Sequence, residues 1–269
     1  MGNHIERYLV KPDSKVHLKS IDPADDGGLD KATATVEFEQ LKERLGELQN
    51  TLYAEARRSL LVVLQAMDTG GKDSLIRSVF TGFNPAGCVV HSFKAPTAEE
   101  LAHDFLWRVH ACAPRRGHVG VFNRSHYEDV LIVRVKSLVP DEVWRERYEH
   151  INRFERLLAD EGTTVVKFFL HISKDYQKER LQKRLDDPAK HWKFEPGDLV
   201  ERKRWDDYQK AYDDVLEKCS TDHAPWYIIP GEKRWYRDLL VAKILVKTLD
   251  KMDLKYPDPK FDPAAIVIE

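Results

Sequence analysis

A glycine-rich segment after an apolar run is the clearest sign of chemistry in this chain. Residues 60–74 read Leu-Leu-Val-Val-Leu-Gln-Ala-Met-Asp-Thr-Gly-Gly-Lys-Asp-Ser, which predicts a buried strand, a turn and the start of a helix. In the usual phosphate-binding loop, backbone N–H groups cradle phosphates, a lysine after glycine neutralises them, and a following hydroxyl holds Mg²⁺. Gly71 and Lys72 fit this pattern.

The loop also departs from that pattern. Ala66 stands where the first glycine is expected, and Asp73 replaces the hydroxyl residue. Asp68 lies inside the loop, where its charge would repel a phosphate unless a cation lay between them. We therefore expect a site for phosphate and metal, with Asp68 as a metal ligand; a turn that only caps a helix is the alternative. The expected phosphate-binding residues are Gly70, Gly71, Lys72, Asp73 and Ser74.

A second polar segment, residues 121–130, follows another apolar run and reads Val-Phe-Asn-Arg-Ser-His-Tyr-Glu-Asp-Val. Carboxyl ends of strands line the ligand crevice of an open α/β sheet, so these polar residues should face the phosphate loop. The spacing of Ser125 and Glu128 also fits a helix capping box, and both interpretations can hold together. His126 alone is typical of a structural hydrogen-bonding residue. The residues expected in the crevice are Asn123, Arg124, Glu128 and Asp129.

A third segment is strongly basic. Arg180, Lys183 and Arg184 recur at helical spacing, Asp187-Pro188 interrupts the helix, and a basic, aromatic loop follows. Beside a phosphate loop, such a segment is typical of a lid that closes over phosphates and brings arginines to the transferring group. We expect the lid at about residues 180–198; a solvated charged helix is the alternative.

The elements that must position these segments form an α/β pattern. Apolar runs near 60–67, 87–93, 118–123, 165–172 and 225–229 are each followed by a helical segment, which predicts a parallel sheet of about five strands with helices on both faces. Before them come an irregular N-terminal arm, residues 1–30, and a long helix, residues 31–57. We expect residues 31–269 to form one domain that includes the lid.

Composition limits the partners. The chain has 269 residues, and 43 basic against 45 acidic side chains give a formal charge of −2, so a polyanion must be held by a local patch and nucleic acid is not expected. Cys88, Cys112 and Cys219 lack metal or redox spacing and indicate reduced thiols. The absence of a run of ~18 apolar residues or a signal segment predicts a soluble cytoplasmic protein.

Together, in this order, the three segments resemble the motifs of the polyphosphate kinase 2 family, over about residues 30–250. The resemblance implies a P-loop kinase-like fold with a helical lid, and Mg²⁺-dependent phosphoryl transfer between inorganic polyphosphate and nucleotides, with Mn²⁺ as an alternative ion. Many members carry Asp-Arg in the second motif and act chiefly on nucleoside diphosphates. Asn123-Arg124 instead resembles the class III subgroup, which phosphorylates both AMP and ADP. The family also suggests a homo-oligomer, a tetramer or a dimer.

The resemblance assigns roles to these residues. Lys72 would bind phosphates, Asp68 and Asp129 would hold the metal, and Arg124 would clamp the transferring group. Arg184 would close from the lid, assisted by Arg180 and Lys183. Polyphosphate would need a track of cations, which adds Arg134. The residues expected to recognise the nucleotide are Arg77, Phe83, Asn84, Lys94, Asn123 and Glu128.

Some of these assignments leave alternatives open. Lys94 is equally well explained as a surface lysine before a turn, and an aromatic residue such as Phe83 is more often part of the core. An ADP-specific polyphosphate kinase and an ATP-dependent kinase for nucleotides or other small molecules would share loop, lid and fold. The departures at Ala66 and Asp73 would also suit a non-catalytic phosphate-binding protein. Against that, Asp68 and Lys72 are both kept, where a decayed site would lose some of its charged residues.

Overall fold

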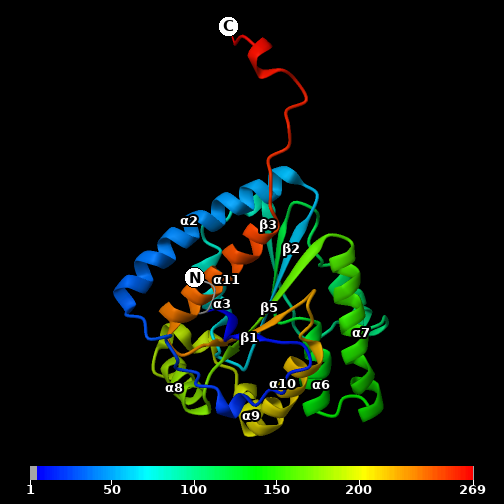
Figure 1. Ribbon diagram of the computed structural model, residues 1–269. Coiled ribbons are helices and arrows are strands. Elements are labelled where there is room, and N and C mark those ends of the chain that lie inside the picture. The colour runs from blue at the N-terminus through cyan, green and yellow to red at the C-terminus, as the bar shows by residue number, and fades with distance from the viewer. Residues whose placement is uncertain (1–4, 269) are drawn as a thin grey trace.

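A mostly parallel sheet forms the centre of the protein (Figure 1). The computed structural model describes residues 5–268, and within them the sheet has six strands in the order β1-β6-β5-β2-β4-β3. The strands are β1 (Leu9–Val10), β2 (Ser59–Ala66), β3 (Cys88–Ser92), β4 (Val119–Asn123), β5 (Thr163–His171) and β6 (Trp226–Pro230). All neighbours pair in parallel except β1 and β6. The predicted α/β class and parallel sheet are confirmed.

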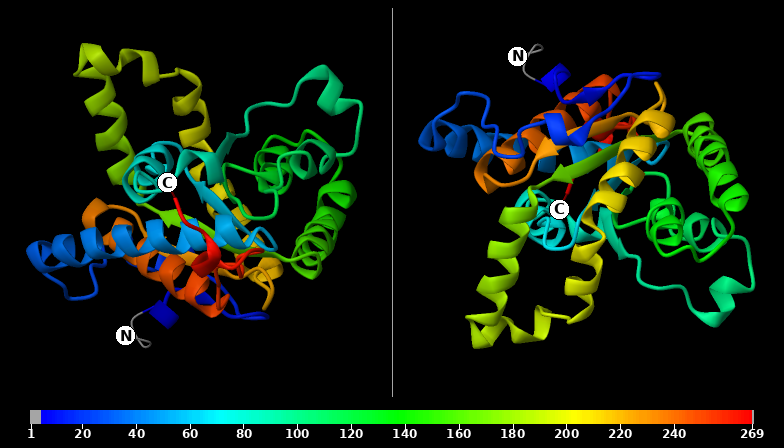
Figure 2. Two further views of the ribbon diagram at one scale, coloured as in Figure 1. Left: turned by 90° about the horizontal axis from the view of Figure 1, so that it is seen from above. Right: turned by 90° about the horizontal axis from the view of Figure 1, so that it is seen from below.

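Helices cover both faces of this sheet (Figure 2). They are α2 (Lys31–Glu55), α3 (Lys72–Val79), α4 (Ala98–Leu101), α5 (Trp107–His110), α6 (Ile132–Val135), α7 (Asp141–Asp160), α8 (Lys174–Leu185), α9 (Gly197–Lys203), α10 (Trp205–Cys219) and α11 (Arg234–Lys251). Short 3-10 helices are η1 (Leu18–Ser20), η2 (Pro85–Gly87), η3 (His126–Val130), η4 (Pro188–Lys193) and η5 (Pro263–Ala265). Among the helices of residues 5–268, none has the length and apolar character needed to cross a membrane.

Strand β2 divides the core into two halves. Every residue of β2 is buried, as a central strand of a covered parallel sheet requires. Because side chains alternate along a strand, Leu60 and Val62 pack with α2, α3 and α11, whereas Leu61 and Val63 pack with α7 and α10. This packing fixes the carboxyl end of β2, where the glycine-rich loop begins.

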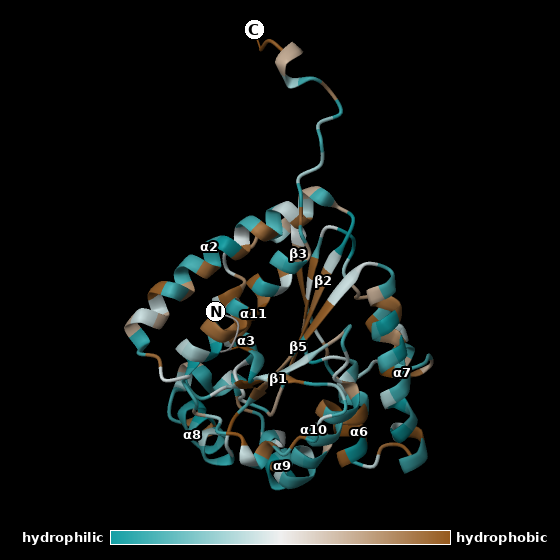
Figure 3. Ribbon diagram, in the orientation of Figure 1, coloured by the Kyte–Doolittle hydropathy of each residue, from teal (hydrophilic) through white to brown (hydrophobic). Residues whose placement is uncertain are grey.

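The lid is a helical hairpin that projects from the body in both views of Figure 2. Helix α8 leaves the sheet after β5, and η4 and α9 lead to α10, which returns to the body. Residues 186–204 of this hairpin carry no buried side chain, and α8 and α9 are mainly hydrophilic in Figure 3. The predicted helical lid is therefore present as an element with few core contacts.

The N-terminal arm differs from the prediction of an irregular segment. Leu9 and Val10 pair with Tyr227 and Trp226 as antiparallel strand β1, so the sheet has one strand more than the expected five. A two-residue strand has too little pattern to be predicted from sequence. Residues 1–4 of the expected arm and residue 269 of the expected domain lie outside the described residues.

The C-terminal segment after α11 leads away from the body (Figure 1). Its apolar side chains are exposed, Val267 at 84% and Ile268 at 93%. The other exposed large apolar residues of this segment are Tyr256, Phe261 and Ile266.

Candidate active site

The glycine-rich loop connects β2 to α3 through a tight turn. Thr69 and Gly71 have positive φ angles of 64° and 93°, and a side chain on Gly70 would come within 2.6 Å of Ala66 Cβ. Only glycine fits a turn this close at position 70. Helix α3 begins at Lys72, so the first N–H groups of this helix point into the crevice as a phosphate cradle requires.

Lys72 lies over the loop. Its Nζ donates to the carbonyl oxygen of Ala66 at 3.1 Å. Burial, followed by repulsion from Arg124, lowers the pKa of Lys72 to about 8, against the opposing attraction of Asp68 and Glu128. A bound anion beside this ammonium group would raise its pKa again.

The second motif meets the loop through two contacts. Arg124 donates to Asp68 Oδ1 at 2.9 Å, and Asn123 Nδ2 donates to Asp73 Oδ1 at 2.7 Å. Burial alone would lower the pKa of Arg124, but the carboxylates of Glu128 and Asp68 outweigh it and raise the pKa. Arg124 also has a positive φ of 63°. Such a backbone is unusual outside glycine, and here it occurs at the residue whose guanidinium contacts Asp68.

Glu128 and Asp129, the two acids of the second motif, have different neighbours. Glu128 acts electrostatically on Lys72 and Arg124, so it faces the loop as expected. Asp129 instead accepts from Arg147 of α7, at 3.0 Å, and burial raises its pKa despite this partner. Glu128 therefore lies at the crevice, whereas the Asp129 carboxylate is paired with an arginine of α7.

A buried polar network anchors the second motif from behind. Glu155 of α7 accepts from Tyr127 at 2.8 Å and contacts His126 Nε2 at 3.1 Å. Lys167, a buried lysine in the middle of β5, pairs with Glu155 and donates to Tyr127 at 2.7 Å. His126 is therefore a structural residue. Ser125 caps η3 as expected but through Tyr127 N, without the predicted capping box with Glu128.

The lid brings arginines and one acid over the loop. Arg184 donates to the carbonyl oxygen of Lys193 at 2.8 Å and to Asp198 at 3.2 Å. Burial and then the nearby charge of Asp68 raise the pKa of Asp198 to about 6. Lys183 differs: it is exposed and pairs loosely with Glu179, one helical turn away at 3.7 Å, which is the solvated role named above as the alternative.

Other cations near the loop come from α11. Arg237 is buried, pairs with Asp238 at 2.6 Å and donates to Ser74 Oγ at 3.1 Å. Burial lowers the pKa of Arg180, and repulsion from Arg234, Arg184 and Arg237 lowers it further, so these arginines lie near one another. Sequence reasoning missed Arg234 and Arg237 because α11 reads as an ordinary packed helix.

The residues expected to recognise the nucleotide are spread over several elements and have different surroundings. Phe83 is buried, with its ring edge-on to Phe80 at 5.1 Å between centroids, so the core interpretation replaces base stacking. The Asn84 side chain caps η2 through Ala86 N. Lys94 is exposed at the end of β3, and its carbonyl accepts from Arg108 at 2.9 Å.

Arg77 and Arg134 were also expected at the site, and they have different neighbours. Arg77 lies in the last turn of α3, directly beyond the phosphate loop. Arg134 donates to Asp214 at 2.6 Å and to the hydroxyl of Tyr148 at 3.2 Å. These contacts between α6, α7 and α10 make Arg134 part of the packing beneath the lid rather than of a free cationic track.

Comparison with known proteins identifies the family. A family model described as Polyphosphate kinase 2 matches residues 28–257. The chain belongs to the polyphosphate kinase 2 family. It is 55% identical over 267 residues to an AMP/ADP-polyphosphate phosphotransferase of Meiothermus ruber, covering 98% of this chain and 100% of that protein. It is 46% identical to an ADP-polyphosphate phosphotransferase of Rhodopseudomonas palustris, covering 80% and 79%.

A solved structure agrees with this family. The polyphosphate kinase 2 of Arthrobacter aurescens TC1 superposes with a TM-score of 0.92 at 45% identity, covering 95% of this chain and 93% of that one. This chain is therefore a phosphotransferase with the fold of polyphosphate kinase 2, and the expected P-loop kinase-like architecture is confirmed.

The acids of this polyphosphate kinase 2 crevice suit Mg²⁺. Within residues 5–268, no three histidine, cysteine, aspartate or glutamate side chains gather as a complete metal cage. Mg²⁺ is usually held by one or two carboxylates together with substrate phosphates and waters, so a cage is not required. Asp68 is 23% exposed, and its charge raises the pKa of Asp198 across the crevice. Asp68 and Asp198 are therefore the carboxylates of this crevice that would hold a hard divalent cation.

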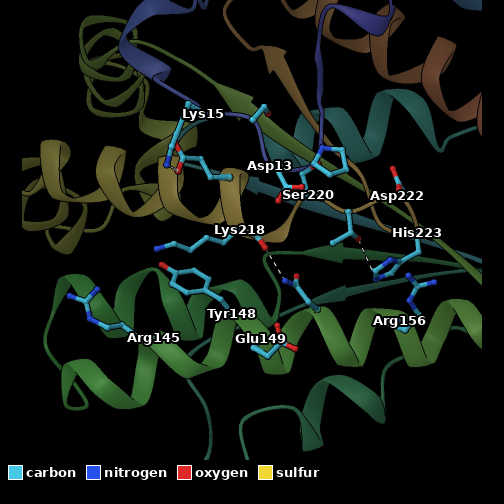
Figure 4. A pocket seen from close by; sticks show the side chains of 15 residues that line it. Asp13, Lys15, Arg145, Tyr148, Glu149, Arg156, Lys218, Ser220, Asp222 and His223 are labelled. Atoms are coloured by element: carbon cyan, nitrogen blue, oxygen red, sulfur yellow. Dashed lines mark hydrogen bonds and ion pairs between the residues drawn. The ribbon is translucent and has the colours of Figure 1, made fainter.

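A separate cavity of this polyphosphate kinase 2 is drawn in Figure 4. It has a volume of about 840 Å³ and is lined by the N-terminal arm, α7 and the end of α10. Its cations are engaged within the protein: Lys15 pairs with Glu217 at 3.2 Å, and Arg145 with Asp141 at 3.1 Å. None of the three predicted motifs lines it, so we place the chemistry at the glycine-rich loop.

Proposed function

We propose that this enzyme transfers a phosphoryl group from inorganic polyphosphate to AMP and to ADP, giving ADP and ATP. The convergence of Asp68, Lys72 and Arg124 beneath the lid arginines carries the proposal. The M. ruber relative, named for both acceptors and similar along its entire length, supports the choice of AMP and ADP.

The protein's contribution is positioning and positive charge, since phosphoryl transfer passes through a loose, metaphosphate-like transition state. Lys72 and the N–H groups at the start of α3 bind the phosphates on either side of the transferred group. Arg124 clamps that group from β4, and Arg184 approaches from the lid. In the free enzyme Arg184 is held by Asp198, so developing charge on the substrate competes with that carboxylate for the guanidinium.

The acceptor needs no strong general base, because a terminal phosphate oxygen of AMP or ADP is already ionised at neutral pH. Asp68 is the proposed Mg²⁺ ligand, with Mn²⁺ as an alternative ion. When bound, the metal would neutralise phosphate charge and help align donor with acceptor. Glu128 would orient substrate or metal-bound water. Asp129 would support this group through Arg147, which makes it the weaker metal candidate.

The donor chain needs a row of cations beyond the transferred group. The charge of Arg234 acts on Arg180, so these two arginines lie near one another, and we assign polyphosphate to them. Arg77, Lys94 and Asn123 remain the proposed nucleotide contacts. Since long polyanions are held mainly by charge, binding should weaken as salt rises.

The first test is a direct assay. Purified protein receives Mg²⁺ and polyphosphate, with AMP or ADP supplied separately, and products are separated by chromatography. ADP followed by ATP from AMP would support the full proposal. ATP from ADP with AMP inert would restrict it to diphosphates, as the name of the R. palustris relative suggests. No product with polyphosphate, but turnover with ATP as donor, would indicate an ordinary kinase.

We also propose a cytoplasmic homo-oligomer, a dimer or a tetramer. The exposed apolar residues of the C-terminal segment offer surface for a second copy. Light scattering of the purified chain with and without residues 256–269 would test this assignment.

A further inference from the structure

Gln177 is a buried amide at the base of the lid. It lies in the first turns of α8 and is 1% exposed, although α8 is otherwise polar and buries only Leu181 besides it. A buried amide is costly unless both of its polar ends have partners. The two hydrogen-bond partners of the Gln177 amide therefore explain its burial.

The two ends of Gln177 bind different parts of the enzyme. Nε2 donates to the main-chain carbonyl oxygen of Asp68 at 3.0 Å, and Oε1 accepts from Arg202 of α9 at 3.0 Å. Asp68 belongs to the phosphate loop and Arg202 to the far arm of the lid hairpin. One side chain thus joins a fixed element to an element with few core contacts.

The loop end of this link lies at a strained point. The Asp68 carbonyl belongs to the peptide that leads into Thr69, whose φ is 64°. The Asp68 carboxylate is held separately by Arg124 at 2.9 Å. Holding the carbonyl on one side and the carboxylate on the other limits how Asp68 can turn in the free enzyme, because rotation of the peptide between Asp68 and Thr69 would break the contact with Gln177.

We propose that Gln177 is a positioning residue that couples the lid to Asp68, so that the seating of α9 and the aim of the metal-binding carboxylate change together. This inference rests on the proposed Mg²⁺ role of Asp68. It predicts that breaking either end of the link weakens the use of Mg²⁺ and also loosens the lid.

Two variants separate the ends. In Gln177→Glu the carboxylate can still accept from Arg202, but it cannot donate to the Asp68 carbonyl and repels it, so the loop end of the link is lost. In Arg202→Met the lid end is lost and the loop end remains. The matched control is Gln182→Glu, which makes the same charge change at an exposed position of the same helix; the Gln182 amide contacts only Asp186, at 2.8 Å.

Two measurements are made on each variant. The first is the Mg²⁺ concentration that gives half-maximal turnover of ADP and polyphosphate. The second, which needs no turnover, is the rate of trypsin cleavage after exposed Lys190 of the lid, with and without ADP and Mg²⁺. For Gln177→Glu we expect the Mg²⁺ requirement to rise about tenfold, as the loss of one buried hydrogen bond allows, and the protection of Lys190 by ADP and Mg²⁺ to be lost. Arg202→Met should move both readouts in the same direction by a smaller factor.

Two results would overturn the coupling between the lid and Asp68. Agreement of Gln177→Glu and Arg202→Met with Gln182→Glu in both measurements would overturn the coupling. A change in cleavage with an unchanged Mg²⁺ requirement would also overturn it, because a purely structural lid contact would behave that way. If Gln177→Glu melts at a much lower temperature than the wild type, Arg202→Met decides. If wild type fails to use polyphosphate, the proposed function fails, while the cleavage assay still reports on the link.

Discussion

The guanidinium of Arg124 donates to the carboxylate of Asp68 at 2.9 Å, across 56 residues of sequence. Asp68 follows β2 and Arg124 follows the adjacent strand β4, so parallel pairing brings the two motifs together at one sheet edge. In the free enzyme each charge satisfies the other. Arrival of a metal and a phosphate would replace this contact with two new ones, because Asp68 would turn to the cation and Arg124 to the anion.

Replacing Asp68 with Asn tests the metal role. Removing the charge of the proposed metal ligand should lower kcat by about 10²-fold or more, with little change in melting temperature because the side chain is partly exposed. Turnover is measured across a range of Mg²⁺ concentrations. Asp222→Asn, at an exposed position beside the large cavity, is the control. Wild-type turnover and Mg²⁺ dependence in Asp68→Asn would remove the metal assignment.

The lid offers a matched pair of cations. Arg184→Ala should lower kcat by on the order of 10³-fold, as expected when an arginine that stabilises the transition state is lost. The neighbouring Lys183→Ala removes an exposed charge and should leave kcat nearly unchanged, with at most a raised KM for polyphosphate. Steady-state kinetics with ADP as acceptor measure both. Equal losses in the two variants would mean that the lid contributes only general positive charge.

The sequence predicted the parts of this molecule that have a local pattern. Apolar runs revealed the five parallel strands, and the glycine-rich turn revealed the phosphate loop, because each occupies consecutive residues. Strand β1 was missed because two residues make no pattern. The choice between base stacking and a core role for Phe83 could not be made from the sequence, because the burial of a single aromatic residue depends on its neighbours in space.

Residues that meet the site from distant elements had no local signal. Arg237 reaches Ser74 from 163 residues away, and Gln177 reaches the Asp68 carbonyl from 109 residues away. Only the packing of α11 and α8 against the loop creates these contacts. The different partners of Glu128 and Asp129 could not be predicted either, because η3 turns the carboxylates of these neighbouring residues in different directions.

The pKa of Lys72 should be unusually low in the free enzyme and should rise when an anion binds. Burial lowers its pKa to about 8 in the free enzyme, and a bound anion should raise it because the charged form then gains a partner. Carbon-13 NMR of isotope-labelled lysine, with Lys72→Met to assign the signal, measures the pKa without ligand and with tripolyphosphate. A free-enzyme pKa above 10, or no rise on binding, would contradict the placement of this ammonium group.

Asp198 should make the stability of the metal-free enzyme depend on pH. Its folded pKa of about 6 lies above its ordinary value, so the folded state binds the proton more tightly. Its contribution to stability is therefore complete at pH below about 4 and is lost as pH rises through 6. We expect the melting temperature of wild type, relative to Asp198→Asn, to fall between pH 4.5 and 7 in the presence of a chelator. Parallel curves for the two proteins would disprove this.

The antiparallel pairing of Leu9 and Val10 with β6 bears on where the folding unit begins. The family model starts at residue 28, so a chain trimmed to that boundary would keep every proposed catalytic residue. It would also uncover the hydrogen-bonding edge of β6, and bare strand edges recruit strands from other molecules. A gene shortened to the shared family region should therefore yield protein that is prone to aggregate, because the arm also supplies the buried core residues Val10, Val16 and Leu18 and β1 covers the edge of the sheet.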